Sequence, residues 1–271
     1  MDVPFFIFNF VLMKIAFSKY HGTGNDFIII DDRNNKIQSK LSPKIINQLC
    51  KRRFGIGADG LILLKKHRSL DFKMIYYNAD GKESSMCGNG GRCLIHFAKQ
   101  LKVFKSHCTF DAIDGLHEGR VEKDKVHLKM ADVDQIKKYR QVYVLDTGSP
   151  HYVKFVEDVA NLNVFKEGSK IRYNNTYSKN GINVNFVQCT SNRIQVRTYE
   201  RGVEDETYSC GTGVVASSIA TILEHKLKNK KVAIKTLGGN LEVTFQKTHK
   251  GFENIWLIGP AVLVNSGIVD I

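Results

Sequence analysis

The sequence contains few prolines and no low-complexity tract, with four prolines in 271 residues. No long linker is therefore visible, and a chain of this length accommodates one large domain or two of ordinary size. Its most apolar segment, residues 1–13, is too short to span a bilayer. The segment carries Asp2 instead of a basic residue near its start, and no small-residue cleavage site follows, so we expect neither a signal peptide nor a membrane partner. We interpret it as an upstream start or an accessory strand, with Met13 as the working start.

The six cysteines lack the spacings of common metal sites. None stands in a CxxC pair, and the spacing between Cys87 and Cys93 fits no common zinc site, so we expect no metal ligands. Without a signal peptide, the thiols are expected to stay free in a reducing cytoplasm. Four of them lie among apolar neighbours, where cysteine is usually a small buried hydrophobe: Cys50, Cys93, Cys108 and Cys189.

Motifs of nucleotide-dependent and hydrolytic enzymes are absent as well. No P-loop, HExxH or GxSxG occurs. Residues 55–60 match G-x-G-x-x-G letter for letter, but they follow a basic helix end and lead into the apolar run 61–64, which is predicted to be a strand. A dinucleotide-binding loop has a strand before it and a helix after it, so we reject nucleotide binding.

Basic residues outnumber acidic ones, with 40 Lys and Arg against 27 Asp and Glu, which gives a net charge of +13. Such an excess raises the question of nucleic acid. The basic residues are scattered, however, except in residues 225–235, and neither a zinc-finger spacing nor a recognition-helix motif accompanies them. We expect a solvated basic surface and no nucleic-acid partner. The alternative, a nucleic-acid-binding module, predicts salt-dependent retention of DNA or RNA and tolerance of Cys87→Ala.

What the sequence does have is an internal duplication centred on two cysteines. Cys87 opens CGNGG and Cys210 opens CGTGV, and each precedes a predicted helix, residues 88–101 and 211–223. The offset between the copies stays at 122 to 124 residues, from the tyrosine upstream of each cysteine to the glycine turn downstream. A register held over about forty residues is typical of two related halves.

The placement of the two thiols suggests proton chemistry. A cysteine at a helix N-terminus lies at the positive end of the helix dipole, beside free backbone N–H groups, and we expect this to lower its pKa. Inverting a carbon stereocentre needs a base on one face and a proton donor on the other, and two such thiols would serve without a cofactor. Charge developing on a substrate carboxylate would be stabilised by backbone N–H groups at the helix starts, those of Gly88, Asn89, Gly211 and Thr212.

Strand-rich halves with one principal helix each predict an α+β fold. In each of two pseudo-symmetric domains, a mixed, mainly antiparallel sheet is expected to wrap a central helix. We place the first domain at residues 1–129 plus 260–271, because the apolar tail could return to the first sheet, and the second at 130–259. A further helix is expected from the N-cap pair Ser42-Pro43 to about Arg53. Runs of β-branched and aromatic residues predict strands at 14–20, 27–31, 61–65, 72–77, 109–113, 118–122, 126–130, 142–145, 152–156, 184–189, 193–199, 232–236, 241–245 and 255–258.

Seven blocks of the sequence carry more specific information: KYHGTGNDF (19–27), RRFGIGADG (52–60), YNADG (77–81), CGNGGRC (87–93), TGSPHY (147–152), GINVNF (181–186) and YERGVEDETYSCGTG (199–213). In this order they resemble the diaminopimelate epimerases, a family of pyridoxal-independent amino-acid epimerases, and the resemblance runs from Met13 to Ile271. It implies two similar domains closing over one substrate, with Cys87 and Cys210 as acid and base. It also implies the interconversion of LL- and meso-2,6-diaminopimelate, in the lysine and peptidoglycan-precursor pathway.

The resemblance assigns further residues to the substrate site. Asn25 matches a substrate-contacting asparagine, and Asn78 and Asn183 match asparagines that help hold the distal end of the substrate. Arg201 matches an arginine that pairs with a carboxylate, where a bidentate fork is apt. Glu200 matches an acid that receives a substrate ammonium.

Three other positions complete this reading. His151 matches a histidine beside the catalytic cysteines, whose supporting task would be hydrogen bonding or proton adjustment. Gly60 and Ser149 depart from members of the family that carry glutamine and asparagine there. These departures remove side chains that could contact substrate, so they affect the expected binding detail more than the expected reaction.

The nearest alternative is a two-cysteine racemase acting on proline or hydroxyproline. Such an enzyme would not need polar residues to hold a second amino-acid head group, and this sequence offers four: Asn78, Asn183, Glu200 and Arg201. A related isomerase on the same fold usually lacks the cysteine pair. A cysteine hydrolase with His151 as base predicts a covalent acyl intermediate and leaves the second helix-end cysteine unexplained. We therefore expect a cytoplasmic epimerase whose partner is its small-molecule substrate, with a homodimer left open.

Overall fold

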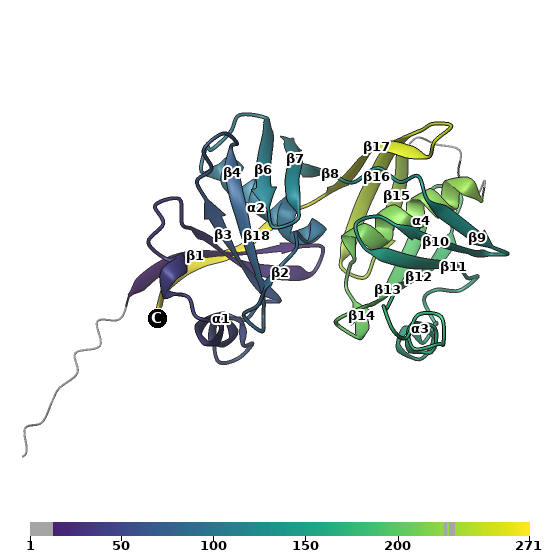
Figure 1. Ribbon diagram of the computed structural model, residues 1–271, viewed down its shortest axis with the longest axis horizontal. Helices are drawn as coiled ribbons and strands as arrows, with labels where there is room; N and C mark the ends of the chain where they lie inside the picture. Colours follow the sequence, from purple (N-terminus) through teal and green to yellow (C-terminus); the bar gives the residue numbers. More distant parts are fainter. Residues whose placement is uncertain (1–12, 225–226, 228–230) are drawn as a thin grey trace, which may run out of the picture.

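The computed structural model describes residues 13–224, 227 and 231–271, and they form two lobes, each a curved sheet around one long helix (Figure 1). Residues 1–12, interpreted from the sequence as an upstream start or an accessory strand, lie outside the described residues, as does part of the basic stretch 225–235. The first lobe contains β1 (Lys14–Gly22), β2 (Asn25–Asp31), η1 (Gln38–Lys40), α1 (Pro43–Cys50), β3 (Gly60–Lys65), β4 (Phe72–Asn78), β5 (Glu83–Ser84), α2 (Gly88–Gln100), β6 (His107–Ala112), β7 (Gly115–Glu122), β8 (Lys125–Lys129) and the last strand, β18 (Val262–Asp270). The second lobe contains β9 (Ile136–Tyr139), β10 (Val142–Asp146), β11 (Pro150–Phe155), α3 (Val164–Arg172), β12 (Asn183–Cys189), β13 (Ile194–Glu200), β14 (Asp205–Thr207), α4 (Gly211–Leu223), β15 (Lys231–Thr236), β16 (Gly239–Lys247) and β17 (Phe252–Gly259).

Strand pairing repeats in the same order in the two lobes. β2 and β3 are parallel, as are β11 and β12, and the later pairs β4–β6 and β13–β15 are parallel too. The series β6–β7–β8 and β15–β16–β17 are both antiparallel. In the chain, α2 lies between β5 and β6, and α4 lies between β14 and β15. The predicted α+β class with two pseudo-symmetric halves is therefore confirmed.

The two short helices α1 and α3 occupy equivalent places. Each connects a parallel strand pair, β2 to β3 and β11 to β12, and a parallel pair needs such a crossover. Ser42 Oγ caps α1 by accepting a hydrogen bond from the N–H of Ile45 at 3.3 Å. Asn163 Oδ1 caps α3 by accepting one from the N–H of Lys166 at 3.0 Å. α3 is not among the helices predicted from the sequence.

Helix α1 ends at Cys50, and the expectation that it continues to about Arg53 is wrong. Arg53 has a φ of 76°, outside the helical region. The chain then folds back onto the end of α1, where a Cβ on Gly55 would lie 2.2 Å from the carbonyl oxygen of Gln48. This close return of the backbone terminates the helix.

The long helices α2 and α4 lie at the centres of the lobes. α2 packs against β1, β2, β3, β7 and β8, and α4 packs against β10–β13 and β15–β17. Residues on every side of both helices are buried, as is typical of a helix inside a core. None of the helices in the described ranges is long and apolar enough to cross a membrane.

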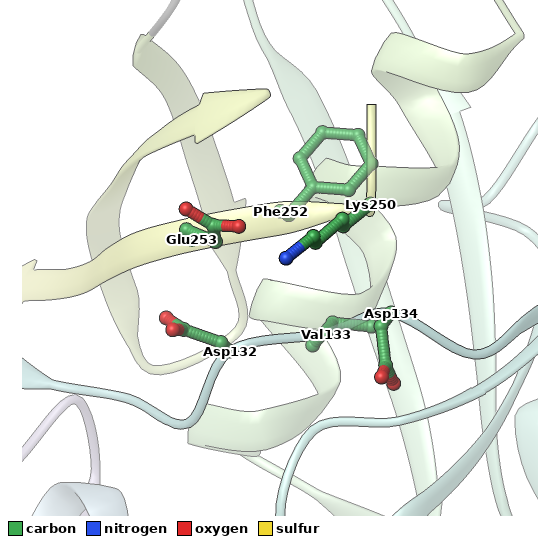
Figure 2. Close-up of a pocket in the computed structure, with 7 residues that line it drawn as sticks. Asp132, Val133, Asp134, Lys250, Phe252 and Glu253 are labelled. Atoms are coloured by element: carbon green, nitrogen blue, oxygen red, sulfur yellow. The ribbon is translucent and has the colours of Figure 1, made fainter. Parts of the chain in front are cut away.

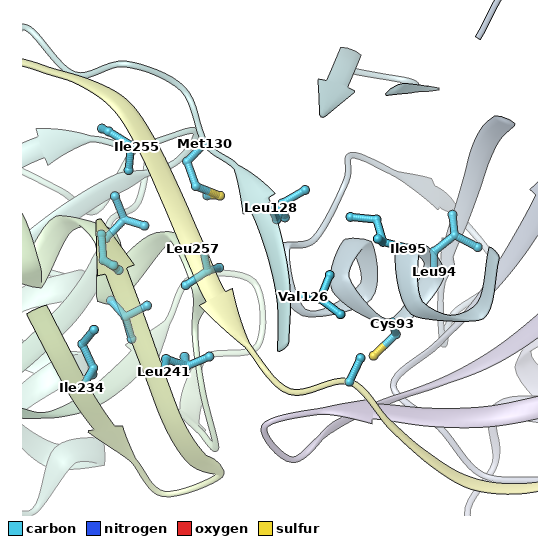
Figure 3. Close-up of a cluster of buried hydrophobic side chains, with 14 of the residues drawn as sticks. Cys93, Leu94, Ile95, Val126, Leu128, Met130, Ile234, Leu241, Ile255 and Leu257 are labelled. Atoms are coloured by element: carbon cyan, nitrogen blue, oxygen red, sulfur yellow. The ribbon is translucent and has the colours of Figure 1, made fainter. Parts of the chain in front are cut away.

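Strands β8 and β17 join the two lobes. They pair antiparallel, with Leu128 opposite Leu257, so that the eighteen strands form one continuous sheet. Figure 3 shows the apolar side chains at this joint, where Val126 and Leu128 of β8 lie between α2 and β17. Both belong to the buried cluster that includes Leu257. The hydrophobic core therefore runs from one lobe into the other.

Strand β18 returns the chain to the first lobe. It pairs antiparallel with β1, from Lys14 opposite Asp270 to His21 opposite Val262. Beyond this ladder, Met13 and the C-terminal residue exchange two backbone hydrogen bonds of 3.0 and 3.1 Å. The division into domains of residues 1–129 plus 260–271 and of residues 130–259 stays a prediction.

Candidate active site

The N-termini of α2 and α4 meet between the lobes. Cys87 and Cys210 are the N-cap residues, and each helix begins at the following glycine, where the sequence places it. A Cβ built on Gly211 would lie 3.4 Å from the Cα of Gly88, and Leu257 packs against both glycines. Residues without side chains allow this close approach of two backbones. The structure therefore brings the two cysteines to one site from opposite lobes.

Burial raises the pKa of both thiols. For Cys87, burial is the largest effect and the charge of Glu200 adds to it, while N–H groups of the first helical turn act in the lowering direction. For Cys210, burial and the same carboxylate also outweigh the hydrogen bonds from its helix end. The expectation of a lowered pKa is wrong for the net shift, because removal from water outweighs the effect of the helix N-terminus. Both cysteines are thiols near neutral pH in this structure.

In the first lobe, Asn25 holds the thiol of Cys87. The Oδ1 of Asn25 lies 3.6 Å from the Cys87 Sγ, and its Nδ2 donates to Asp59 at 2.6 Å. Arg52 donates to the other carboxylate oxygen of Asp59 at 2.8 Å and keeps that acid in place. Because a carboxylate can only accept, the amide nitrogen of Asn25 must face it and the amide oxygen must face the thiol. Asp59 is not among the predicted site residues, and in the sequence it stands only as part of a glycine-rich block.

Asn89 connects the two lobes through its side chain. Its Nδ2 donates to the carbonyl of Ser209, in the segment before α4, at 2.9 Å and to Asn25 Oδ1 at 3.2 Å. The fully buried Arg92 donates to Asn89 Oδ1 at 2.9 Å and to the carbonyl of Gly88 at 3.1 Å. The backbone N–H of Asn89 is predicted to contact substrate. Its side chain connects the first turn of α2 to the start of α4.

In the second lobe, His151 lies one hydroxyl group away from Cys210. Its Nε2 lies 2.9 Å from Thr212 Oγ1, and that oxygen lies 3.5 Å from the Cys210 Sγ. Burial, assisted by the charge of Arg201, lowers the pKa of His151 to about 3. The ring is therefore neutral at physiological pH, so it can orient hydrogen bonds but cannot act as a cationic partner of a thiolate.

The carboxylate of Glu200, at the end of β13, acts on both cysteines. It accepts a hydrogen bond from Thr207 Oγ1 at 2.8 Å. Burial raises the pKa of Glu200, and the nearby charge of Asp59 adds to the rise. None of the salt bridges among the described residues involves Glu200. A partly buried acid of this kind is suited to receive an ammonium group.

Asn183, Arg201 and Ser149 form a second polar group. Asn183 donates to Ser149 Oγ at 2.8 Å and accepts from the backbone N–H of Arg201 at 2.9 Å. The guanidinium of Arg201 donates to the carbonyl of Asn180 at 3.1 Å and to Ser149 Oγ at 3.5 Å. The serine that departs from part of the resembled family therefore orients both predicted binding residues.

Asn78 and Gly60 lie opposite each other in the β3–β4 ladder, with Asn78 exposed at the strand end. The glycine has a steric cause, because a Cβ there would lie 2.6 Å from both Tyr76 Cε2 and the carbonyl oxygen of Tyr77. Burial, followed by the charge of Cys87, raises the pKa of Tyr76. The buried phenol of Tyr76, which is not among the predicted site residues, thus occupies the space beside Gly60.

A cavity of about 210 Å³ lies apart from the cysteines, at the turn between β16 and β17 (Figure 2). Its lining includes the acidic residues Asp132, Asp134 and Glu253 together with Lys250. None of the predicted site residues lines it. Among the described residues, no group of three or more histidines, cysteines or acids is placed to hold a metal ion.

Similarity to known proteins covers most of the chain. A family model for diaminopimelate epimerase matches residues 17–135 and 143–264. A diaminopimelate epimerase of Flavobacterium psychrophilum is 51% identical over 248 residues, which cover 91% of this chain and 96% of the relative. One of Chlorobaculum tepidum is 38% identical and covers 92% of this chain and 99% of the relative.

Solved structures of more distant proteins share the fold. A PhzF-family phenazine biosynthesis protein of Bacillus anthracis aligns with a TM-score of 0.74 at 14% identity, over 96% of this chain and all of the other. A hydroxyproline epimerase of Agrobacterium vitis aligns with a TM-score of 0.67 at 12% identity, over 95% of this chain and 93% of the other. Similarity at this level of identity concerns architecture alone. Together with the family match and the close relatives, the helix-end cysteines and the duplicated lobes place this chain in the diaminopimelate epimerase family.

Proposed function

We propose that this protein is a diaminopimelate epimerase that interconverts the LL and meso isomers by moving a proton at one α-carbon. Cys87 and Cys210 are the acid and the base. One is thiolate and the other thiol in each direction, so the base removes the proton from one face while the acid delivers a proton to the other. The reaction needs no further acid–base group and no organic cofactor.

The observation that carries this proposal is the meeting of two helix N-termini, each capped by a cysteine. The helix ends approach so closely that a Cβ on Gly211 would lie 3.4 Å from the Cα of Gly88, so one substrate carbon can lie between the two thiols. Backbone N–H groups at both helix starts suit a substrate carboxylate, because the first N–H groups of a helix have no partner within it. These groups stabilise the negative charge that accumulates on the carboxylate as the α-proton leaves.

Glu200 couples substrate binding to thiol ionisation. Its negative charge contributes to the raised pKa of both Cys87 and Cys210. A substrate ammonium bound at Glu200 neutralises that charge and adds a positive charge near the sulfurs. Both effects favour a thiolate, so the base forms when the substrate is present.

The polar group of Asn183, Arg201 and Ser149, together with Asn78 and Asn25, holds the rest of the substrate. A second amino-acid head group matches this set, because it offers a carboxylate to the guanidinium and hydrogen-bonding groups to the amides. Proline and hydroxyproline lack such a distal group. We also place the enzyme in the cytoplasm and in the route to lysine and peptidoglycan precursors, with homodimer formation left open.

Solvent deuterium incorporation into LL-diaminopimelate tests the proposal. We expect the reduced wild-type protein to exchange one α-hydrogen and to form the meso isomer. Cys87→Ala and Cys210→Ala should each lose racemisation by at least about 100-fold, because each removes one of the two acid–base groups. Cys50→Ala is the matched control, since Cys50 is a buried core thiol of α1.

If Cys50→Ala also loses activity, removal of any thiol is sufficient to inactivate the protein. That result would count against the assignment of Cys87 and Cys210. If the reduced wild-type protein exchanges no hydrogen in diaminopimelate, the substrate assignment is wrong, and proline and hydroxyproline are the substrates to test next.

A further inference from the structure

Asn185 is a fully buried side chain of β12 to which the family resemblance assigns no role. Its Oδ1 accepts from Thr198 Oγ1 at 2.9 Å, and its Nδ2 donates to the carbonyl of Tyr152 at 3.3 Å. A carbonyl can only accept, so these two contacts fix which end of the amide is nitrogen. A Cβ on Gly213 would lie 2.3 Å from Asn185 Oδ1, so the glycine of α4 makes room for this arrangement.

The fixed amide determines the tautomer of His151. Asn185 Nδ2 lies 3.0 Å from His151 Nδ1 and can only donate to it. His151 Nδ1 must therefore accept, and the single proton of the neutral ring lies on Nε2. That nitrogen lies 2.9 Å from Thr212 Oγ1, so His151 donates to the threonine hydroxyl.

The donated hydrogen bond in turn orients Thr212. With Oγ1 already accepting from His151, the hydroxyl hydrogen is available to the Cys210 Sγ, 3.5 Å away. A hydroxyl that donates to sulfur favours the thiolate over the thiol. If His151 carried its proton on Nδ1, its unprotonated Nε2 would accept a hydrogen bond from the Thr212 hydroxyl. That hydroxyl could then no longer donate to the Cys210 sulfur.

We propose that Asn185 is a positioning residue which, through His151 and Thr212, directs a hydrogen bond onto Cys210 and thereby favours its thiolate form. This inference rests on the proposed function. The other charged and titratable groups that act on the chain of contacts are Glu200 and Cys87 on the sulfur and Arg201 on the histidine. No proton needs to move along this series of hydrogen bonds, because the effect depends only on which atom of each bond carries the hydrogen.

The first test reads the tautomer directly in the full-length wild-type protein. Nitrogen-15 NMR of the histidine side chains, with the His151 signal assigned by its loss in His151→Gln, should show a protonated Nε2 and an unprotonated Nδ1. A protonated Nδ1 would overturn the proposal. This measurement requires neither turnover nor a variant of Asn185.

The second test is Asn185→Asp, which keeps the side-chain shape but can accept from His151 Nδ1–H. We expect kcat to fall about 10-fold, the scale of one lost hydrogen bond to a charged group. In a Cys87→Ala background, alkylation of Cys210 by iodoacetamide at pH 8 should slow by a similar factor, about 10-fold. Alkylation of Cys87 in a Cys210→Ala background is the matched control for the added charge, and it should change by less than about twofold.

Thr212→Val tests whether Asn185→Asp affects Cys210 through the Thr212 hydroxyl or by another route. Valine removes the hydroxyl and keeps the backbone N–H, so Asn185→Asp should have almost no further effect on Cys210 alkylation in that background. If the effects of the two substitutions simply add, Asn185 does not act through Thr212 and the proposal is wrong. Wild-type protein with the expected tautomer and the expected alkylation pattern, but no turnover of diaminopimelate, would reject the proposed function and leave the positioning role of Asn185 intact.

Discussion

At the scale of single residues, the pKa of each of the two thiols is set by effects that act in opposite directions. The helix ends favour the thiolate, whereas burial and the charge of Glu200 favour the thiol. The sequence allows the first effect to be predicted, because the cysteine stands at the start of an obvious helix. It does not reveal burial, which depends on how the two lobes close over the site.

Glu200→Gln measures one of these opposing effects. Loss of the carboxylate removes a negative charge that raises both thiol pKa values, so we expect the acidic limb of the kcat/KM profile to move to lower pH. The variant should also bind the substrate ammonium less well, with kcat/KM lower by about 10- to 100-fold at its optimum. A pH–rate profile measures both effects.

Glu157→Gln, which removes an exposed acid of the same lobe, is the control and should leave the profile in place. An acidic limb that moves to higher pH in Glu200→Gln would contradict this account of the thiols.

The residues that the sequence leaves out share one property. Asp59, Tyr76 and Asn185 act through neighbours that are distant in sequence, and none stands at a recognisable position such as a helix start. Asn25 and Asn183 are named by resemblance, yet their orientation depends on Asp59 and Ser149, which only the three-dimensional contacts show. Residue type and spacing therefore identify the site, while its hydrogen-bond directions require the structure.

At the scale of elements, the long helices and most strands follow from sequence pattern, whereas α3 and the strands β5, β9, β14 and β18 are absent from the predicted elements. The helix contains Gly168 near its middle and exposes Phe165, so its apolar pattern is weak. The glycine is required by packing, because a Cβ there would lie 2.4 Å from the Cβ of Tyr199. Tertiary packing here outweighs helix propensity.

Gly168→Ala is accordingly expected to destabilise the protein. In an isolated helix this change stabilises by about 1 kcal/mol, but here the overlap with Tyr199 should reduce the free energy of unfolding by about 1–3 kcal/mol. Urea denaturation measures the change. Lys166→Ala, an exposed position of the same helix, is the control and should stay within about 0.5 kcal/mol of wild type. A stabilised Gly168→Ala would mean that the helix moves freely away from β13.

At the scale of the whole molecule, duplication in the sequence predicts two lobes but not how they meet. The contact of Gly88 with Gly211 and the β8–β17 ladder both lie between the halves, and neither leaves a periodic signal in the chain. The position of the two cysteines relative to each other is therefore a property of the assembled pair of lobes.

Oxidation provides a check on that assembly. Because both thiols reach one site, we expect diamide to join Cys87 and Cys210 in a disulfide, with loss of activity and of two of the six free thiols. Dithiothreitol should restore both. Cys87→Ser should lose no pair of thiols under the same treatment. Inactivation that dithiothreitol does not reverse, or that leaves all thiols free, would show that the two sulfurs do not come together.

The ladder between β1 and β18 also has a consequence for how the protein is made. β1 is the first strand of the described chain and β18 is the last, so the first lobe lacks β18 until β9–β17 have been translated. The strands β9–β17 of the second lobe are contiguous in sequence and can assemble as soon as they leave the ribosome. The half of the molecule that is translated first is thus the half that is finished last.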